Sequence, residues 1–222
     1  MTKIEKNLEL IQNQIENAKL RTNQMQEVKI IAVTKEVDVA RTEEAIAAGI
    51  VHLGENRPEG LARKLESIDS DVEWHYIGSL QTRKVKQVIG QINYLHSLDR
   101  LSLAEEIEKR ATNVVKCFVQ VNISGEESKQ GLTKEQALEF IKQLQPFTKI
   151  EVVGLMTMAP FTEDAHAIRQ VFRELKQLQQ EVVQLRLPNV PCTELSMGMS
   201  NDYEIAVEEG ATFVRIGTAL VG

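Results

Sequence analysis

The 222-residue sequence has little of what marks several protein classes. It holds only two cysteines, Cys117 and Cys192, which lie far apart in apolar stretches. This favours buried free thiols over a disulfide framework. No apolar run approaches the roughly 20 residues that span a bilayer. The charged start, MTKIEKNLELIQ, lacks the apolar core of a signal peptide. We therefore expect a cytoplasmic protein with no membrane partner.

The sequence also lacks an excess of positive charge and any pattern of metal ligands. The chain has 26 Lys and Arg against 32 Asp and Glu, a net charge of −6, so nucleic acid is not an expected partner. The four histidines, His52, His75, His96 and His166, show no metal-ligand spacing with a thiol or carboxylate, and we expect no metal. The hydrophobic share of 42% is an ordinary globular value and is enough to fill a core.

Short apolar runs alternate with amphipathic stretches along most of the chain. The runs are 28–34, 51–54, 73–78, 92–98, 115–123, 150–158, 192–197 and 212–217. Helical patterns between them include 37–49, 101–111 and 164–185. About eight strand–helix units predict an α/β fold, a single (β/α)8 TIM-type barrel domain over residues 1–222. The competing fold is an open doubly wound sheet, but the first turn, VTKEVD, lacks the glycines that it needs.

The two ends of the chain are unusual for such a barrel. Residues 3–26 form a helical pattern before the first strand, with an apolar stripe that has no evident partner. The sequence reaches Gly222 just after the last strand, which leaves no room for an eighth outer helix. We therefore expect the N-terminal helix to cover the gap left by the missing last helix.

The carboxyl ends of the strands are where such barrels place their functional sites. Lys35 follows the first strand, at the rim of an apolar interior. Desolvation there would lower the pKa of its ammonium and make the amine a nucleophile toward carbonyls. The alternative is a lysine whose amine simply reaches solvent.

The last two strands end in segments rich in small residues and hydroxyls, SMGMSN at 196–201 and RIGT at 215–218. Backbone N–H groups in such segments can approach a bound phosphate, which these barrels commonly hold after strands seven and eight. The alternative for the first segment is a helix-capping turn at Ser200 or Asn201. The alternative for Arg215 is an ion pair with a neighbouring strand-end carboxylate.

Strands one and eight are neighbours in a closed barrel, so Lys35 would face this phosphate cup. An amine beside a phosphate anchor suits a phosphorylated aldehyde. Pyridoxal phosphate is the commonest such cofactor, and a sugar phosphate is the other candidate.

At these residues the sequence resembles the pyridoxal phosphate homeostasis protein family, whose fold is similar to the N-terminal barrel of alanine racemase. The matching segments are IAVTK (31–35), LGENRPEG (53–60), WHYIGSLQTRK (74–84), VNISGEESKQG (121–131), GLMTM (154–158) and the final stretch from LSMGMSND to GTALVG (195–222). They keep the family's order over nearly the whole chain. Many members continue past GTALVG.

The resemblance implies a role for each residue of the site. Lys35 would carry pyridoxal 5'-phosphate as an internal aldimine, and Arg215 would lie beside the pyridine nitrogen. The phosphate contacts would be Ser200, Gly217 and Thr218, with backbone from the Met199 region. Asn56 would line the ring pocket. The rim loop 125–131 contains Lys129, either a second amine or anion contact or a solvated surface lysine.

The resemblance also implies a function. The family binds and handles pyridoxal phosphate in vitamin B6 homeostasis, without an established catalytic activity. An arginine at the ring nitrogen would repel a ring proton and weaken the electron sink on which catalysis depends. The sequence also has no room for a second domain that could supply another base. We expect a monomer with little amino-acid turnover, with client pyridoxal phosphate enzymes as possible partners. The alternatives are a small pyridoxal-phosphate-dependent racemase or lyase and a cofactor-free enzyme that acts on a sugar phosphate.

Overall fold

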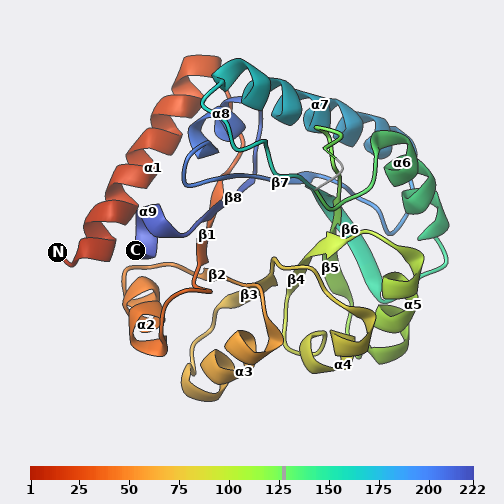
Figure 1. Cartoon of the computed structure of the whole chain (residues 1–222), viewed down its shortest axis with the longest axis horizontal. Coiled ribbons are helices and arrows are strands. Elements are labelled where there is room, and N and C mark those ends of the chain that lie inside the picture. The colour runs from red at the N-terminus through yellow and green to blue at the C-terminus, as the bar shows by residue number, and fades with distance from the viewer. Residues whose placement is uncertain (127–128) are drawn as a thin grey trace.

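The computed structural model describes residues 1–126 and 129–222. In these residues eight parallel strands close into a barrel in chain order (Figure 1). The strands are β1 (Lys29–Val33), β2 (His52–Glu55), β3 (Glu73–Tyr76), β4 (Tyr94–Leu98), β5 (Val115–Gln120), β6 (Ile150–Met156), β7 (Glu194–Met199) and β8 (Phe213–Ile216). The pairing of β1 with β8 closes the ring. The predicted TIM-type barrel is confirmed.

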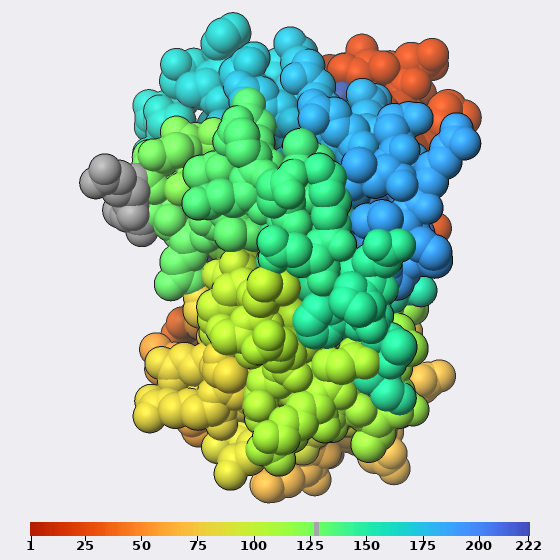
Figure 2. Space-filling view, turned by 90° about the vertical axis from the view of Figure 1, so that its right-hand side faces the viewer, coloured from red at the N-terminus to blue at the C-terminus, as the bar shows by residue number. Residues whose placement is uncertain are grey.

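One helix precedes the first strand and the others follow the strands, and together they form the outer layer. They are α1 (Lys3–Thr22), α2 (Val39–Ala47), α3 (Pro58–Ser67), the 3-10 turn η1 (Thr82–Lys84) with α4 (Val85–Val88), α5 (Leu101–Arg110), α6 (Lys134–Gln143), α7 (Ala165–Gln184), α8 (Tyr203–Glu208) and α9 (Thr218–Val221). Figure 2 looks at the side that α5, α6 and α7 cover. No helix in the described residues is long and apolar enough to cross a membrane.

The N-terminal helix covers the expected gap. Thr2 and Glu5 form a capping box at its start, and its buried residues recur every three or four positions: Ile4, Leu8, Ile11, Ile15 and Ala18. This face packs against α8 and α9, and α1 lies beside them in Figure 1. After β8 the described residues form only one helical turn, α9 (residues 218–221), and α1 covers this side of the barrel as expected.

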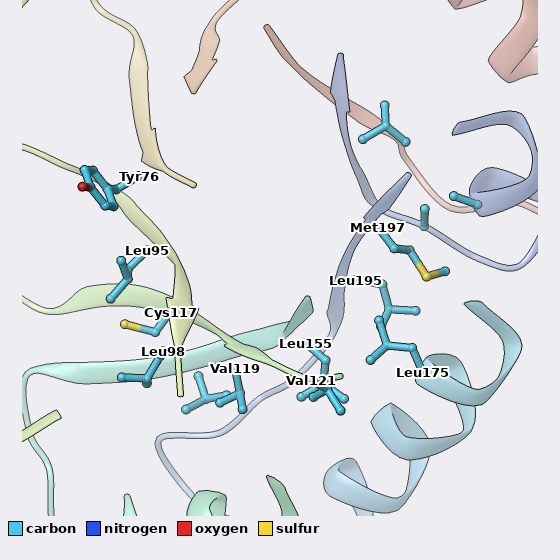
Figure 3. Close-up of a cluster of buried hydrophobic side chains, with 14 of the residues drawn as sticks. Tyr76, Leu95, Leu98, Cys117, Val119, Val121, Leu155, Leu175, Leu195 and Met197 are labelled. Atoms are coloured by element: carbon cyan, nitrogen blue, oxygen red, sulfur yellow. The ribbon is translucent and has the colours of Figure 1, made fainter. Parts of the chain in front are cut away.

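The barrel has an apolar shell between its strands and helices. Outward-facing strand residues fill this layer, and Figure 3 shows Leu195 and Met197 of β7 beside Leu175 of α7. Cys117 and Cys192 are buried and free, as predicted. The shell fixes the helices against the strands and leaves the barrel interior to a separate set of side chains.

With one exception, at the register shift on β6, the interior set follows from the alternation of side chains along each strand. It contains Ile31, Tyr94, Phe118, Val153, Met156 and Phe213. On β1, Lys35 has the inward parity of Ile31, and on β8, Arg215 has that of Phe213. The alternation therefore directs both basic residues toward the barrel axis, at or near the carboxyl ends of their strands.

Candidate functional site

The wall formed by β1 and β8 brings the predicted residues together. Ile31 pairs with Arg215, and Ala32 pairs with Ile216. A Cβ placed on Gly217 would lie 3.6 Å from the Cβ of Val33. Lys35 comes two residues after Val33 on the same face. Lys35, Arg215 and Gly217 therefore share one side of the barrel mouth.

Lys35 itself is exposed, and in the described residues its ammonium forms no hydrogen bond or ion pair. The sequence argument invoked desolvation at this position, and that expectation is wrong. The physical reason is the position of Lys35 along the barrel axis. Strand β1 ends at Val33, so Lys35 lies beyond the packed interior, at the open mouth of the barrel. The fold places Lys35 on the inward face of β1 and leaves its amine accessible to solvent.

Arg215 is the buried cation of this wall, with only 4% of its surface exposed. Its Nη1 donates to Ser196 Oγ at 2.5 Å, and its Nη2 donates to the carbonyl oxygen of Thr157 at 3.0 Å. Burial lowers the pKa of Arg215 to about 10, against the opposing charge of Asp202, so it remains a cation at neutral pH. The alternative of an ion pair is wrong, since no carboxylate in the described residues pairs with it.

The loops after β7 and β8 meet at Ser200. This half-buried side chain accepts a hydrogen bond from the backbone N–H of Ala219, with 3.5 Å between Oγ and N. Gly217 precedes α9, and the exposed Thr218 begins it. The Ser200 hydroxyl and the backbone of the loop after β8 therefore meet at the place where the sequence predicts an anion site.

The turn after β7 differs from the capping alternative. Helix α8 begins at Tyr203 with Asp202 as its N-cap residue, so neither Ser200 nor Asn201 caps it. The Asp202 carboxylate accepts from Met199 N at 2.6 Å, so this one N–H is occupied within the loop. A phosphate contact from the backbone of the Met199 region stays a prediction. Burial raises the pKa of Asp202, while the Met199 N–H opposes the rise. The side chain of Met199 is 39% exposed.

Asn56 follows β2, and its inward parity matches that of Gly54. It is half-buried. Its backbone packs so closely on Gly78 that a Cβ there would lie 2.3 Å from the Asn56 carbonyl oxygen. A side chain at position 78 would therefore displace the backbone of Asn56, so this position requires glycine. The contact of Asn56 with a ligand ring stays a prediction.

A buried ion pair behind Lys35 was not foreseen. Lys64 of α3 donates from Nζ to the Glu55 carboxylate and to the Thr34 carbonyl oxygen. The Thr34 hydroxyl donates to the same carboxylate at 2.6 Å. The side chains of Lys64 and Glu55 are 1% and 2% exposed. The sequence signal is a lysine in the apolar stripe of α3, between Leu61 and Ile68.

Three histidines occupy inward positions on three consecutive strands. His52 Nδ1 lies 3.0 Å from His75 Nε2, and His75 Nδ1 lies 2.8 Å from His96 Nε2. His96 Nδ1 lies 2.9 Å from Ser196 Oγ. His75 is thus a hydrogen-bonded histidine of the interior. A visible signal was present, since successive strands each carry one histidine at the same parity.

Two further positions complete the mouth. Lys129 Nζ lies 2.9 Å from a carboxylate oxygen of Glu126, which favours an ion-paired surface lysine. Glu127 and Ser128 of the same predicted loop lie outside the described residues. Met156 packs in the interior as expected, whereas Met158 is 37% exposed.

Comparison with known proteins agrees with this arrangement. The profile of the family "Alanine racemase, N-terminal domain" matches residues 4–222. The pyridoxal phosphate homeostasis protein of Aquifex aeolicus is 43% identical over 198 residues, which cover 87% of this chain and 86% of that protein.

Two solved structures have the same fold. PipY of Synechococcus elongatus, solved with pyridoxal phosphate bound, superposes with a TM-score of 0.85 at 32% identity, covering 99% of this chain and 100% of PipY. An alanine racemase of Clostridium difficile superposes with a TM-score of 0.73 at 15% identity, covering 97% of this chain and 55% of the racemase, and shows the shared fold alone. The chain therefore belongs to the pyridoxal phosphate homeostasis protein family, on a barrel of the alanine racemase N-terminal type.

Proposed function

We propose that this chain binds pyridoxal phosphate at the barrel mouth and takes part in intracellular pyridoxal phosphate homeostasis. One observation carries the proposal. The pairing of β1 with β8 sets an accessible amine, Lys35, on the same wall as a buried cation, Arg215, and the Gly217–Thr218 turn. The PLP-bound PipY structure and the relatives' name support it.

The residues present fit the chemical groups of this ligand. Arg215 is a charged donor without a carboxylate partner in the described residues, which suits an unprotonated ring nitrogen. The hydroxyls of Ser200 and Thr218, with the backbone of Gly217 and Thr218, suit the phosphate; the Ala219 N–H already donates to Ser200 Oγ. Helices α8 and α9 have six and four residues, so individual N–H groups matter more here than helix dipoles.

Lys35 supplies the covalent link. After loss of a proton to solvent, its neutral amine attacks the aldehyde carbon. A C=N bond to Nζ forms, and the aldehyde oxygen leaves as water with the two remaining amine protons. The exposure of Lys35 leaves this link open to exchange with free amines.

The same geometry argues against efficient amino-acid turnover. Pyridoxal phosphate supplies an electron sink when its ring nitrogen is protonated. Arg215 is held as a donor and a cation, so it favours an unprotonated ring nitrogen and opposes a ring proton. We infer binding and exchange without significant racemase or lyase activity.

Spectroscopy with chemical trapping tests the proposal. The purified protein mixed with pyridoxal phosphate should absorb in the visible range, and borohydride reduction with peptide mapping should place the label on Lys35. Lys35→Ala should abolish the covalent label, whereas the matched rim variant Lys129→Ala should keep it. Label on another lysine would overturn the assignment of Lys35. A protein that takes up no pyridoxal phosphate would overturn the function and favour the sugar-phosphate alternative.

We further infer that residues 1–222 act as a single barrel domain, as a cytoplasmic monomer, with client pyridoxal phosphate enzymes as partners. The accessible mouth supports transfer to another protein, since Lys35 is exposed. Transfer from the loaded protein to an apo-enzyme that is faster than spontaneous release would support direct delivery. Equal rates would contradict it. Sedimentation analysis measures the oligomeric state.

A further inference from the structure

A continuous line of polar groups runs through the barrel interior beneath Arg215. It passes from Arg215 to Ser196, His96, His75 and His52, with donor–acceptor distances of 2.5, 2.9, 2.8 and 3.0 Å. His75 and His96 are fully buried, and Ser196 is too. His52 is half-buried and lines a cavity at the amino ends of β1 and β2, beside α1.

The barrel stagger produces this line. His52 pairs with Glu73, two residues before His75, and His75 pairs with Tyr94, two residues before His96. Each histidine therefore lies one inward position nearer the mouth than the one before it. Ser196 then joins His96 to Arg215, although β4 and β7 are not neighbours in the sheet.

The direction of these hydrogen bonds follows from Arg215, which can only donate. Ser196 Oγ accepts from Nη1, and its only acceptor neighbour in the described residues is His96 Nδ1, so the hydroxyl donates there. A neutral His96 then carries its proton on Nε2 and donates to His75 Nδ1. By the same argument His75 donates from Nε2 to His52 Nδ1.

We propose that Ser196, His96, His75 and His52 form a one-way hydrogen-bond chain that positions Arg215 as the donor to the ring nitrogen of the ligand. The proposal rests on the proposed function for the identity of that ligand. These four are positioning residues, because they act through Arg215.

A neutral chain is the state that this geometry allows. His75 and His96 each have one donor and one acceptor in use, and His52 uses its acceptor, so an added proton on any of them would set two N–H groups against each other. Burial, together with the charge of Arg215, holds the pKa of His96 well below its usual value. Burial and the neighbouring histidines do the same for His75. Arg215 therefore keeps a fixed acceptor on Nη1 and a fixed orientation.

The first experiment determines the tautomers of the hydrogen-bonded histidines in the ligand-free protein. Nitrogen-15 NMR of the imidazoles should show His52, His75 and His96 each as the Nε2–H tautomer. Ser196→Ala removes the donor to His96 Nδ1, and should give mixed tautomers at His96 and at His75. Ser97→Ala is the matched control, because Ser97 is a buried serine whose hydroxyl has no partner in the described residues. An Nδ1–H tautomer at His75 or His96 in the natural protein would overturn the proposal, as would unchanged tautomers in Ser196→Ala.

The second experiment reads the effect on Arg215. Ser196→Ala should weaken pyridoxal phosphate binding about tenfold in an absorbance titration, since a hydrogen bond to a charged group is lost. Ser97→Ala should bind as the natural protein does, and Ser196→Thr, which keeps the hydroxyl, should bind more tightly than Ser196→Ala. Equal affinity in Ser196→Ala and the natural protein would refute positioning. If the natural protein binds no pyridoxal phosphate, the proposed function fails while the NMR result still decides the chain.

Discussion

Two buried cations, Lys64 and Arg215, lie on opposite sides of the barrel wall and have different hydrogen-bond partners. Lys64 lies in the shell between β2 and α3, and its amine contacts the Glu55 carboxylate. Arg215 lies inside the barrel, and its guanidinium contacts a hydroxyl and a carbonyl oxygen. Both side chains are almost fully removed from solvent.

The difference separates a charge that is paired within the fold from one that is not. Burying a charge is costly unless an opposite charge and hydrogen bonds offset the cost. Lys64 meets both conditions within the fold. Arg215 has the hydrogen bonds but no carboxylate in contact with it in the described residues, which is the state expected of a cation in a ligand site.

Removing the amine of the paired cation gives the largest expected effect. Lys64→Met leaves the Glu55 carboxylate buried and unpaired, and should lower the free energy of unfolding by about 3–5 kcal/mol. Lys64→Met combined with Glu55→Leu should recover most of the loss, because no charge then remains. Urea unfolding measures both. If the double variant is no more stable than Lys64→Met alone, the unpaired Glu55 carboxylate is not the cause of the lost stability.

The histidines of the interior make stability depend on pH. Their pKa values are lowered by burial, so below about pH 6.5 the unfolded chain binds protons that the folded chain does not. The free energy of unfolding should therefore fall as pH falls, by about 1.4 kcal/mol per pH unit for each of His75 and His96.

Urea unfolding at pH 7.5, 6.5 and 5.5 checks this slope. His96→Gln should reduce the pH dependence of the free energy of unfolding by the contribution of one histidine. His166→Gln is the control, because His166 is exposed on α7, and it should keep the natural slope. A slope that His96→Gln leaves intact would contradict the assignment.

Removing the unpaired cation should affect binding more than stability. Arg215→Met relieves a buried charge but leaves the Thr157 carbonyl oxygen without its donor. These effects oppose each other, so we expect a loss below about 2 kcal/mol. Pyridoxal phosphate binding should weaken by about tenfold or more. A loss of stability equal to that of Lys64→Met would erase the distinction between the two cations.

A third cation, Arg21 of α1, gives the smallest effect. Its side chain is 49% exposed and contacts Glu204 and Glu208 of α8. Exposed pairs contribute about 0.2–1 kcal/mol, so Arg21→Ala should have a cost in that range that shrinks in high salt. A larger, salt-independent cost would show that packing of α1, and not charge, holds this contact.

Much of the site could be predicted because it depends on order and alternation. Eight apolar runs predicted the barrel, and closure of the barrel made the first and last strands neighbours. Lys35 and the Arg215–Thr218 segment could therefore be placed on one wall. The exposure of Lys35 could not be foreseen, because it depends on where β1 ends relative to the packed interior.

The interior contacts escaped prediction for a related reason. Ser196 and His96 are 100 residues apart on strands that do not pair. Irregular register between β4 and β5, and between β7 and β8, shifts their heights further. Lys64 reaches Glu55 and Thr34 only once α3 has packed over β1 and β2.

The amino-acid sequence by itself determined the strand count, the inward or outward face of most strand side chains and the pairing of the chain's first and last strands. These follow from a period of two residues and from closure of the sheet. Only the tertiary structure decided which inward residues stand at equal height across the barrel. That depends on stagger and register shifts, and it gave Arg215 a serine and a line of histidines instead of a carboxylate.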